Sequence, residues 1–300
     1  MLLRTVTFAL AVLLAVLLSL PATAQDAAHH QSDDMAAVGK ALANPLSDVW
    51  ALFTEFDFSF SEGDVDKGNW RFGSTMAFQP VMPIKLTENW KLITRPSIPV
   101  VWTADVPEPD GSGGVDFDGK FGLGDIFLPL LASPNKAPEL FGGDIAVGLG
   151  PTWLFPTSTP DVLGAEKWGV GPAGILVWKN QKVTTGFFPQ YWWSFASRDS
   201  DRDPVSKGIL LYFFFYNLPN AWQIGTNPNI TYDHKASSGN KWNVPIGITV
   251  AKTTKIGNKP VKFQLGAEYS VVSQDDFGKR FMLKLNIIPV IAPLIKNPIF

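Results

Sequence analysis

The chain has 300 residues, of which 46% are hydrophobic, 13% aromatic and 17% charged, with a formal net charge of −2 at pH 7. This low charged fraction and high aromatic content argue against a disordered chain, a coiled coil or a charge-rich cytosolic enzyme, and the charge balance offers no basic surface for nucleic acid. The chain has no cysteine, which excludes a disulfide scaffold, thiolate metal sites and a cysteine nucleophile. Its three histidines argue against a multi-histidine metal centre.

Residues 1–24 have the features of a secretory signal peptide. Arg4 supplies a positive charge, residues 6–20 form an apolar run, and Ala22-Thr23-Ala24 offers a small-x-small cleavage site. No later stretch approaches the roughly 18 to 20 apolar residues of a membrane-spanning helix. We therefore predict an exported protein whose mature chain begins at Gln25.

Residues 25–49 are predicted to form a periplasmic N-terminal segment. The segment is polar and rich in alanine, and Asp33 and Asp34 can cap a short helix over residues 35–42. Asn44 and Pro45 are expected to end that helix, because proline disfavours the helical conformation of the residue before it.

From residue 50 onward, the hydrophobic period changes to two. In residues 50–60, for example, Phe56 and Phe58 alternate with Glu55 and Asp57, which is typical of a strand with one apolar face. We predict twelve strands, over residues 50–60, 70–78, 90–102, 125–131, 145–155, 168–178, 183–195, 208–216, 222–232, 242–250, 261–271 and 281–289.

The connections between these strands are of two kinds. Six are polar and hold 16 of the chain's 27 carboxylates, whereas others, such as residues 179–182 and 217–221, are short. Outer-membrane barrels have long loops at one end and short turns at the other, and bacterial ones have an even number of strands. The pattern favours an all-β fold, a closed antiparallel transmembrane β-barrel over residues 50–300.

The tryptophans support a barrel in a membrane over a soluble β-sandwich or lipocalin-like barrel, which alternation alone does not exclude. All eleven lie at or within three residues of a predicted strand end, and all but Trp192 share the apolar face. Two girdles of aromatic side chains at the bilayer boundaries account for this placement. The predicted membrane-interface residues are Trp50, Trp90, Trp178 and Trp222 at the periplasmic end and Trp70, Trp102, Trp153, Trp168, Trp193 and Trp242 at the outer end.

Prolines inside the predicted strands are the main objection, because each removes a ladder hydrogen bond. Nine prolines fall there, among them Pro96, Pro151 and Pro228, and bulges could absorb some of them. The proline-containing tail of residues 291–300 also fits poorly as a closing strand. Either residues 281–289 close the barrel and a periplasmic tail follows, or the register is shifted.

Short motifs along the mature chain resemble a family of bacterial outer-membrane transporters often labelled "MetA-pathway of phenol degradation". The motifs occur in order at residues 43–45 (ANP), 79–83 (QPVMP), 90–95 (WKLITR), 98–100 (IPV), 122–125 (GLGD), 150–157 (GPTWLFPT), 168–172 (WGVGP), 193–195 (WSF), 216–222 (YNLPNAW) and 239–247 (GNKWNVPIG). The resemblance implies an outer-membrane β-barrel linked to uptake of small aromatic or hydrophobic compounds, and it implies no catalytic residues.

Side chains of inward parity form the main candidate site. The predicted lumen-lining residues are Glu55, Asp57, Arg71, Lys91, Arg95, Phe188, Trp192, Lys262, Glu268 and Lys284. Closing the barrel places the charged members on consecutive strands along one wall, where opposite charges stabilise one another. They could form a polar track for a solute or a salt-bridge network that fills the barrel. Across the lumen, Phe188 and Trp192 are expected to form an aromatic wall with Tyr212 and Tyr216.

Other motifs carry little chemistry. Residues 199–203 imitate the start of a calcium loop, but Pro204 replaces the required glycine. His234 beside Asp233 lacks a nucleophile elbow, so we predict no catalytic residue, no metal site and no cofactor.

We predict a channel in the bacterial outer membrane for passive uptake of a small, hydrophobic or aromatic solute. The expected partners are outer-membrane lipid and lipopolysaccharide, the barrel-assembly machinery through the terminal Phe300, and the solute. The alternatives are a soluble periplasmic β-barrel carrier and, less favoured, an outer-membrane barrel enzyme of the lipase type.

Overall fold

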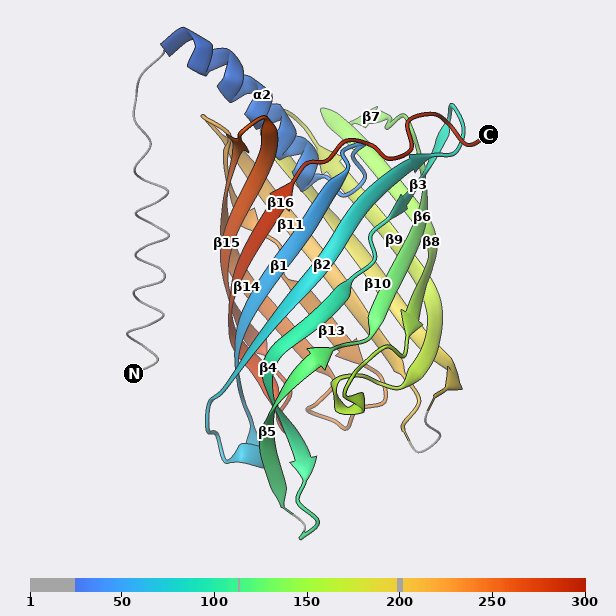
Figure 1. Ribbon diagram of the computed structural model, residues 1–300, viewed down its shortest axis with the longest axis vertical. Helices are drawn as coiled ribbons and strands as arrows, with labels where there is room; N and C mark the ends of the chain where they lie inside the picture. The colour runs from blue at the N-terminus through green and yellow to red at the C-terminus, as the bar shows by residue number, and fades with distance from the viewer. Residues whose placement is uncertain (1–24, 113, 199–201) are drawn as a thin grey trace.

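A computed structural model describes residues 25–300 apart from residues 113 and 199–201 (Figure 1). The predicted signal peptide lies outside the described residues. The chain forms one long helix followed by strands that run up and down around a single barrel. The elements are α2 (Gln25–Ala43), β1 (Ala51–Glu62), η1 (Asp64–Asp66), β2 (Arg71–Lys85), β3 (Trp90–Thr94), β4 (Ile98–Pro109), β5 (Val115–Leu123), β6 (Ile126–Pro134), β7 (Glu139–Leu140), β8 (Gly143–Phe155), η2 (Asp161–Leu163), β9 (Lys167–Lys179), β10 (Val183–Ser197), β11 (Ser206–Leu218), β12 (Trp222–Thr226), β13 (Asn229–Asp233), β14 (Trp242–Ile256), β15 (Lys259–Val272) and β16 (Gly278–Pro289).

The sheet closes on itself, because β1 pairs antiparallel with both β2 and β16. Three crossings of the wall are each made of two pieces, β3 with β4, β5 with β6, and β12 with β13, and β7 is a two-residue strand at one end. The barrel therefore has twelve antiparallel crossings, which confirms the predicted fold class and strand number. Closure removes the sheet edges that would otherwise expose unpaired backbone groups.

Proline explains two of the three interruptions. Pro96 lies between β3 and β4, and Pro228 lies between β12 and β13. The missing proline N–H interrupts the ladder at both places. Other prolines stay inside strands: Pro151 faces Pro172 across β8 and β9, and a register shift on β14 falls at Pro245. Arg95 and Asn227, the residues just before Pro96 and Pro228, both line the central cavity described below.

The two ends of the barrel differ in their connections. At one end, here called the short-turn end, links such as residues 180–182, 219–221 and 257–258 join neighbouring strands. The opposite, long-loop end carries residues 63–70, 156–166, 234–241 and 273–277 and the projecting hairpin of β4 and β5, seen at the bottom of Figure 1.

Helix α2 leads into the barrel at the short-turn end. It begins ten residues before the helix predicted over residues 35–42 and ends one residue after it. Ala43 and Leu46, at and just after the helix end, are buried in an apolar cluster with Ile93, Leu131 and Val177 from the barrel wall. The capping residues in the sequence predict a helix here, but they do not show that its end packs inside the barrel. None of the described helices is long and apolar enough to cross a membrane.

Strand β16 ends at Pro289 and closes the barrel, so a tail follows it, as one of the two sequence-based alternatives expected. The tail runs along the rim of the short-turn end. The Ile291 N–H donates to the Trp50 carbonyl, and the Phe300 N–H donates to the Leu86 carbonyl. The Phe300 side chain itself is 87% exposed.

Candidate functional site: the barrel lumen

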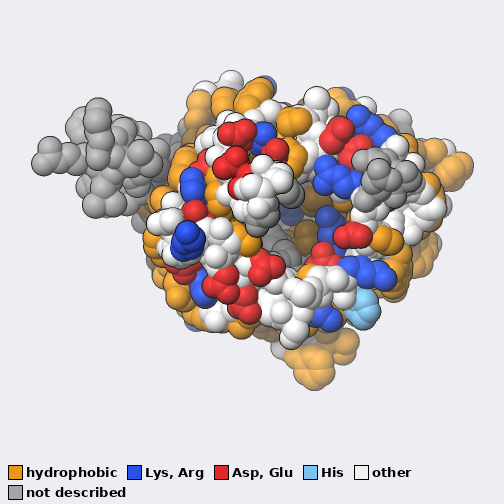
Figure 2. Space-filling model, turned by 90° about the horizontal axis from the view of Figure 1, so that it is seen from below, with side chains coloured by type: hydrophobic (Ala, Val, Ile, Leu, Met, Phe, Trp, Pro, Cys, Tyr) orange, Lys and Arg blue, Asp and Glu red, His pale blue; other side chains and the backbone are white. Residues whose placement is uncertain are grey.

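Side chains alternate between the outer and inner surfaces of the wall. On β10, Phe187 is 53% exposed and Phe188 only 5%, and on β14 the exposed Ile248 precedes the buried Thr249. Seen from the long-loop end, apolar side chains lie around the outside, and charged side chains ring a hollow in the centre (Figure 2). The outer surface is thus apolar, and the hollow interior holds the polar groups that could contact a solute.

Most of the predicted interface tryptophans lie on the outer surface. Trp70, Trp90, Trp102, Trp168, Trp193 and Trp242 are 41–56% exposed, and Trp153, Trp178 and Trp222 are partly exposed. Trp50 needs a correction, because it is only 3% exposed and does not face outward. Its indole N–H donates to the Pro83 carbonyl at 3.0 Å. The position just before β1 places this side chain under the rim of the barrel, which strand parity alone did not reveal.

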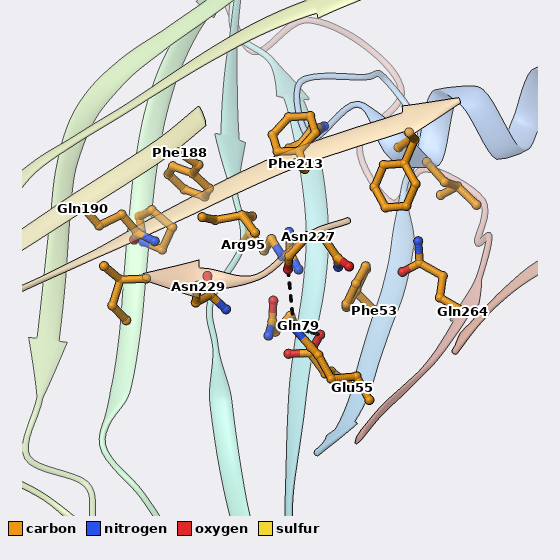
Figure 3. A pocket seen from close by; sticks show the side chains of 18 of the residues that line it. Phe53, Glu55, Gln79, Arg95, Phe188, Gln190, Phe213, Asn227, Asn229 and Gln264 are labelled. Atoms are coloured by element: carbon orange, nitrogen blue, oxygen red, sulfur yellow. Dashed lines mark hydrogen bonds and ion pairs between the residues drawn. The ribbon is translucent and has the colours of Figure 1, made fainter. Parts of the chain in front are cut away.

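A central cavity lies inside the barrel, with a volume of about 110 Å³ (Figure 3). Its wall contains charged or amide side chains, including Glu55, Gln79, Arg95, Asn227, Gln264 and Lys284, and apolar side chains, including Phe53, Phe188, Phe213 and Phe215. Leu42, Ala43 and Pro45 from the end of α2 close it toward the short-turn end. The cavity is amphipathic: apolar side chains form much of its wall, and a few polar groups converge on it, as in small-molecule sites.

Lys284 is the centre of a buried charge cluster on one wall. Its Nζ lies 3.5 Å from Glu55 Oε2 and 3.1 Å from Glu268 Oε1, and it donates to the Asn227 carbonyl at 3.4 Å. Asp57 lies across from Lys284 on the paired strand, and its Oδ1 has no hydrogen-bond partner among the described residues. One cation therefore offsets a group of three carboxylates in the interior.

Two further predicted lysines hold the N-terminal segment. Lys91 Nζ donates to the Leu46 carbonyl and to Asp48 Oδ1, both at 2.7 Å. Lys262, which is fully buried, donates to the Gly39 carbonyl at 3.3 Å and lies 4.9 Å from the Phe215 ring centroid. A cation near the C-terminal end of a helix also interacts favourably with the helix dipole. Both lysines face the interior, and their partners are α2 and the turn that follows it.

Arg95 lies in the interruption between β3 and β4 and reaches the central cavity (Figure 3). Its guanidinium carbon lies 4.3 Å from the centroid of the Phe53 ring. Its Nε is buried without a hydrogen-bond partner among the described residues. No described carboxylate lies within 4 Å of the guanidinium, which distinguishes Arg95 from Lys91 and Lys284.

Arg71 lies apart from these residues, at the long-loop end. It pairs with Asp66 at 2.5 Å and with Asp105 at 3.6 Å, and its guanidinium carbon lies 4.2 Å from the Phe117 ring centroid. The Arg71 hydrogen bond holds the pKa of the Asp66 carboxyl below its usual value. Arg71 thus ties a loop to the wall and does not line the central cavity.

The aromatic wall differs in part from the expectation. Phe188 and Trp192 are buried in the interior, and the Trp192 indole N–H donates to Thr152 Oγ1 at 3.2 Å. The prediction for Tyr212 and Tyr216 is wrong: Tyr212 pairs with the outward Phe187, and Tyr216 is exposed on the outside.

Phe213 and Phe215, from the same strand β11, take the inward positions instead. Residues 211–216 are apolar on both faces, so their own pattern carries no parity signal. Pairing with β10 decides it, because Phe213 lies opposite Gly186, the inward neighbour of Phe188.

The described residues of the remaining motifs form no second site. Part of the calcium-like stretch lies outside the described residues, at 199–201. The His234 ring lies beside Tyr232, with 3.2 Å between its Nδ1 and the hydroxyl oxygen. Within the described part of the chain, no group of three or more histidine, aspartate or glutamate side chains could hold a metal ion.

A closed barrel of even strand number with an apolar outer surface, tryptophans toward its two ends and a polar interior is a transmembrane β-barrel. No family model matches the chain, and no curated protein matches it. Several solved structures do match the chain. The chain is similar to the COG4313 outer membrane channel from Pseudomonas putida F1, with 15% identity and a TM-score of 0.57 over 82% of this chain and 97% of that one. It also matches outer membrane phospholipase A from Escherichia coli, with 10% identity and a TM-score of 0.37 over 84% of this chain and 97% of that one. At these identities the likeness concerns the fold.

Proposed function

We propose that this protein is an outer-membrane channel that lets a small hydrophobic or aromatic solute cross by passive diffusion. The observation that carries the proposal is the amphipathic cavity at the centre of a barrel whose outer surface suits lipid. The similar fold of a protein described as an outer membrane channel supports it. In this proposal the long-loop end faces outward, the short-turn end faces the periplasm, and the outer wall contacts lipid and lipopolysaccharide.

The route through the barrel has three cavities in series. A cavity toward the long-loop end, lined in part by Trp192 and Lys207, shares Phe127 and Ile209 with the central cavity. A third, toward the short-turn end, is lined in part by Lys40, Lys91 and Lys179. Residues 41–46 lie between this cavity and the central one, because they contribute side chains to both. The end of α2 and the turn after it thus control the periplasmic exit in this proposal.

The family suggested by the sequence motifs, and with it a role in the uptake of phenolic compounds, belongs to the same proposal. Contact between Phe300 and the barrel-assembly machinery also stays a prediction. An enzyme of the lipase type is less favoured, because the described residues that line the central cavity include no serine or histidine.

Solute uptake by liposomes containing the purified mature protein tests the channel. We expect phenol-sized neutral solutes to enter these liposomes faster than they enter liposomes without protein. We also expect the protein to fractionate with outer membranes. It should also migrate differently on gels before and after boiling, as a closed barrel does. A soluble, monodisperse protein in detergent-free extracts would support a periplasmic carrier, and ester hydrolysis by the purified protein would support an enzyme.

A further inference from the structure

The central cavity holds a guanidinium that makes no ion pair with any described carboxylate. Among the described residues, Lys284 has two carboxylates within 4 Å and Lys91 has one, whereas Arg95 has none. Glu55, the carboxylate that lines the same cavity, lies within 3.5 Å of Lys284. A cation in a largely desolvated interior is costly unless it is paired.

The surroundings of Arg95 hold its guanidinium in place without neutralising it. The ring of Phe53 lies against it at 4.3 Å, which is a favourable cation–π distance. Its Nε has no protein partner among the described residues, while the side chain as a whole is only partly buried because it borders the cavity. A planar guanidinium with free donors facing a cavity matches the geometry of a carboxylate, which can accept two parallel hydrogen bonds from it.

Apolar rings line the other part of the same cavity. Phe188, Phe213 and Phe215 are each no more than 5% exposed and come from β10 and β11, whereas Arg95 follows β3 (Figure 3). Rings of this kind favour an aromatic partner in offset or edge-on contact. The cavity volume of about 110 Å³ is close to the roughly 150 Å³ of an apolar cavity that binds benzene, so the cavity can take a one-ring compound.

We infer that the central cavity binds a small aromatic carboxylate, with the carboxylate on the Arg95 guanidinium and the ring against Phe188 and Phe213. The inference rests on the proposed channel function and specifies its solute class. A neutral phenol would fill the apolar part but leave the arginine charge unpaired. A carboxylate satisfies both parts of the cavity.

The adjoining cavities also present cations to such a solute. Lys207 lines the cavity toward the long-loop end and Lys40 the one toward the short-turn end, and neither has a described carboxylate within 4 Å. Asp48 and Asp144, near Lys40, are paired with Lys91 and Lys179. A cation without a paired carboxylate therefore occurs in each of the three cavities.

Equilibrium binding of benzoate and benzamide to the purified full mature chain tests the inference, because the two probes differ in charge but hardly in shape. We expect benzoate to bind more tightly than benzamide. Arg95→Gln should weaken benzoate binding about tenfold or more, as for loss of a charge-assisted hydrogen bond, and leave benzamide binding nearly unchanged. Arg95→Lys should give an intermediate result, because lysine keeps the charge but loses the two-point geometry.

Arg280→Gln is the matched control, since Arg280 pairs with Glu62 at the long-loop end and lines none of the three cavities. Gel mobility before and after boiling checks that each variant folds. Equal binding of the two probes by the wild type, or an equal loss of both in Arg95→Gln, would overturn the inference. Liposome uptake of benzoate and benzamide separates the two proposals. Uptake without preferential benzoate binding would contradict the inference but support the channel. Uptake of neither probe would contradict the channel itself.

Discussion

Buried charge in this barrel is arranged residue by residue around a few cations. Lys284 is 2% exposed and lies beside Glu55 and Glu268, which are themselves buried. Removing one partner of such a group leaves the other charges buried and unpaired, which costs more than the group contributes when intact. The cluster is therefore a place where a single substitution has a large and specific effect.

Replacing Lys284 by methionine should destabilise the barrel by about 3 kcal/mol, because two neighbouring carboxylates lose their cation. The measurement is the urea midpoint for unfolding from lipid vesicles. Lys255→Met, at an exposed position on β14 away from these carboxylates, serves as the control and should change the midpoint little. A Lys284→Met midpoint equal to that of wild type would show that water, and not Lys284, stabilises these carboxylates.

At the scale of elements, the wall depends on close approach between neighbouring strands. A Cβ at Gly150 on β8 would lie 1.9 Å from the backbone oxygen of Leu130 on β6. A similar contact occurs at Gly171 on β9, where a Cβ would lie 1.9 Å from the Tyr191 oxygen. Backbone atoms cannot rotate away as side chains can, so glycine at these positions lets the strands pack next to the in-strand prolines Pro151 and Pro172.

Gly150→Ala should destabilise the barrel by about 1–3 kcal/mol, as overpacking does. Gly119→Ala provides a control within a strand, because its Cβ would meet Thr103 Oγ1 at 3.6 Å and Asp105 Oδ1 at 3.9 Å, both ordinary contacts. The two variants are compared by the temperature at which the gel band of the folded protein is replaced by that of the unfolded protein. Equal conversion temperatures would mean that β6 moves aside without cost.

At the scale of the whole molecule, the barrel and its N-terminal helix form one unit. Lys91 and Lys262 bind carbonyls at Leu46 and Gly39, and the end of α2 packs in the interior cluster. Because Leu42, Ala43 and Pro45 close the central cavity, the helix end must shift for a solute to pass to the short-turn end. The width of the passage therefore depends on how firmly α2 is held.

A disulfide between Gly39→Cys and Thr253→Cys should hold α2 against the wall and suppress most solute flux. A Cβ at Gly39 would lie 3.3 Å from the Thr253 Cβ, near the separation that a disulfide requires, and the chain has no other cysteine to interfere. Liposome uptake is compared before and after reduction, and Thr253→Cys alone is the control. Unchanged uptake in the oxidised double variant would indicate a route that avoids α2.

The alternating pattern by itself determined the barrel, its twelve crossings and the faces of most strands, because a period of two records which side chains meet lipid and which meet the interior. It placed Glu55, Arg95, Lys262 and Lys284 inside by parity, and the structure finds them there. The partners of these residues could not be predicted, since Lys262 and Gly39 are 223 residues apart in the chain. Only the tertiary structure decided that α2 closes the cavity, that Phe213 and Phe215 replace Tyr212 and Tyr216 on the inner face, and that Arg95 makes no ion pair with a described carboxylate. Each depends on contacts between segments distant in sequence, which local periodicity does not encode.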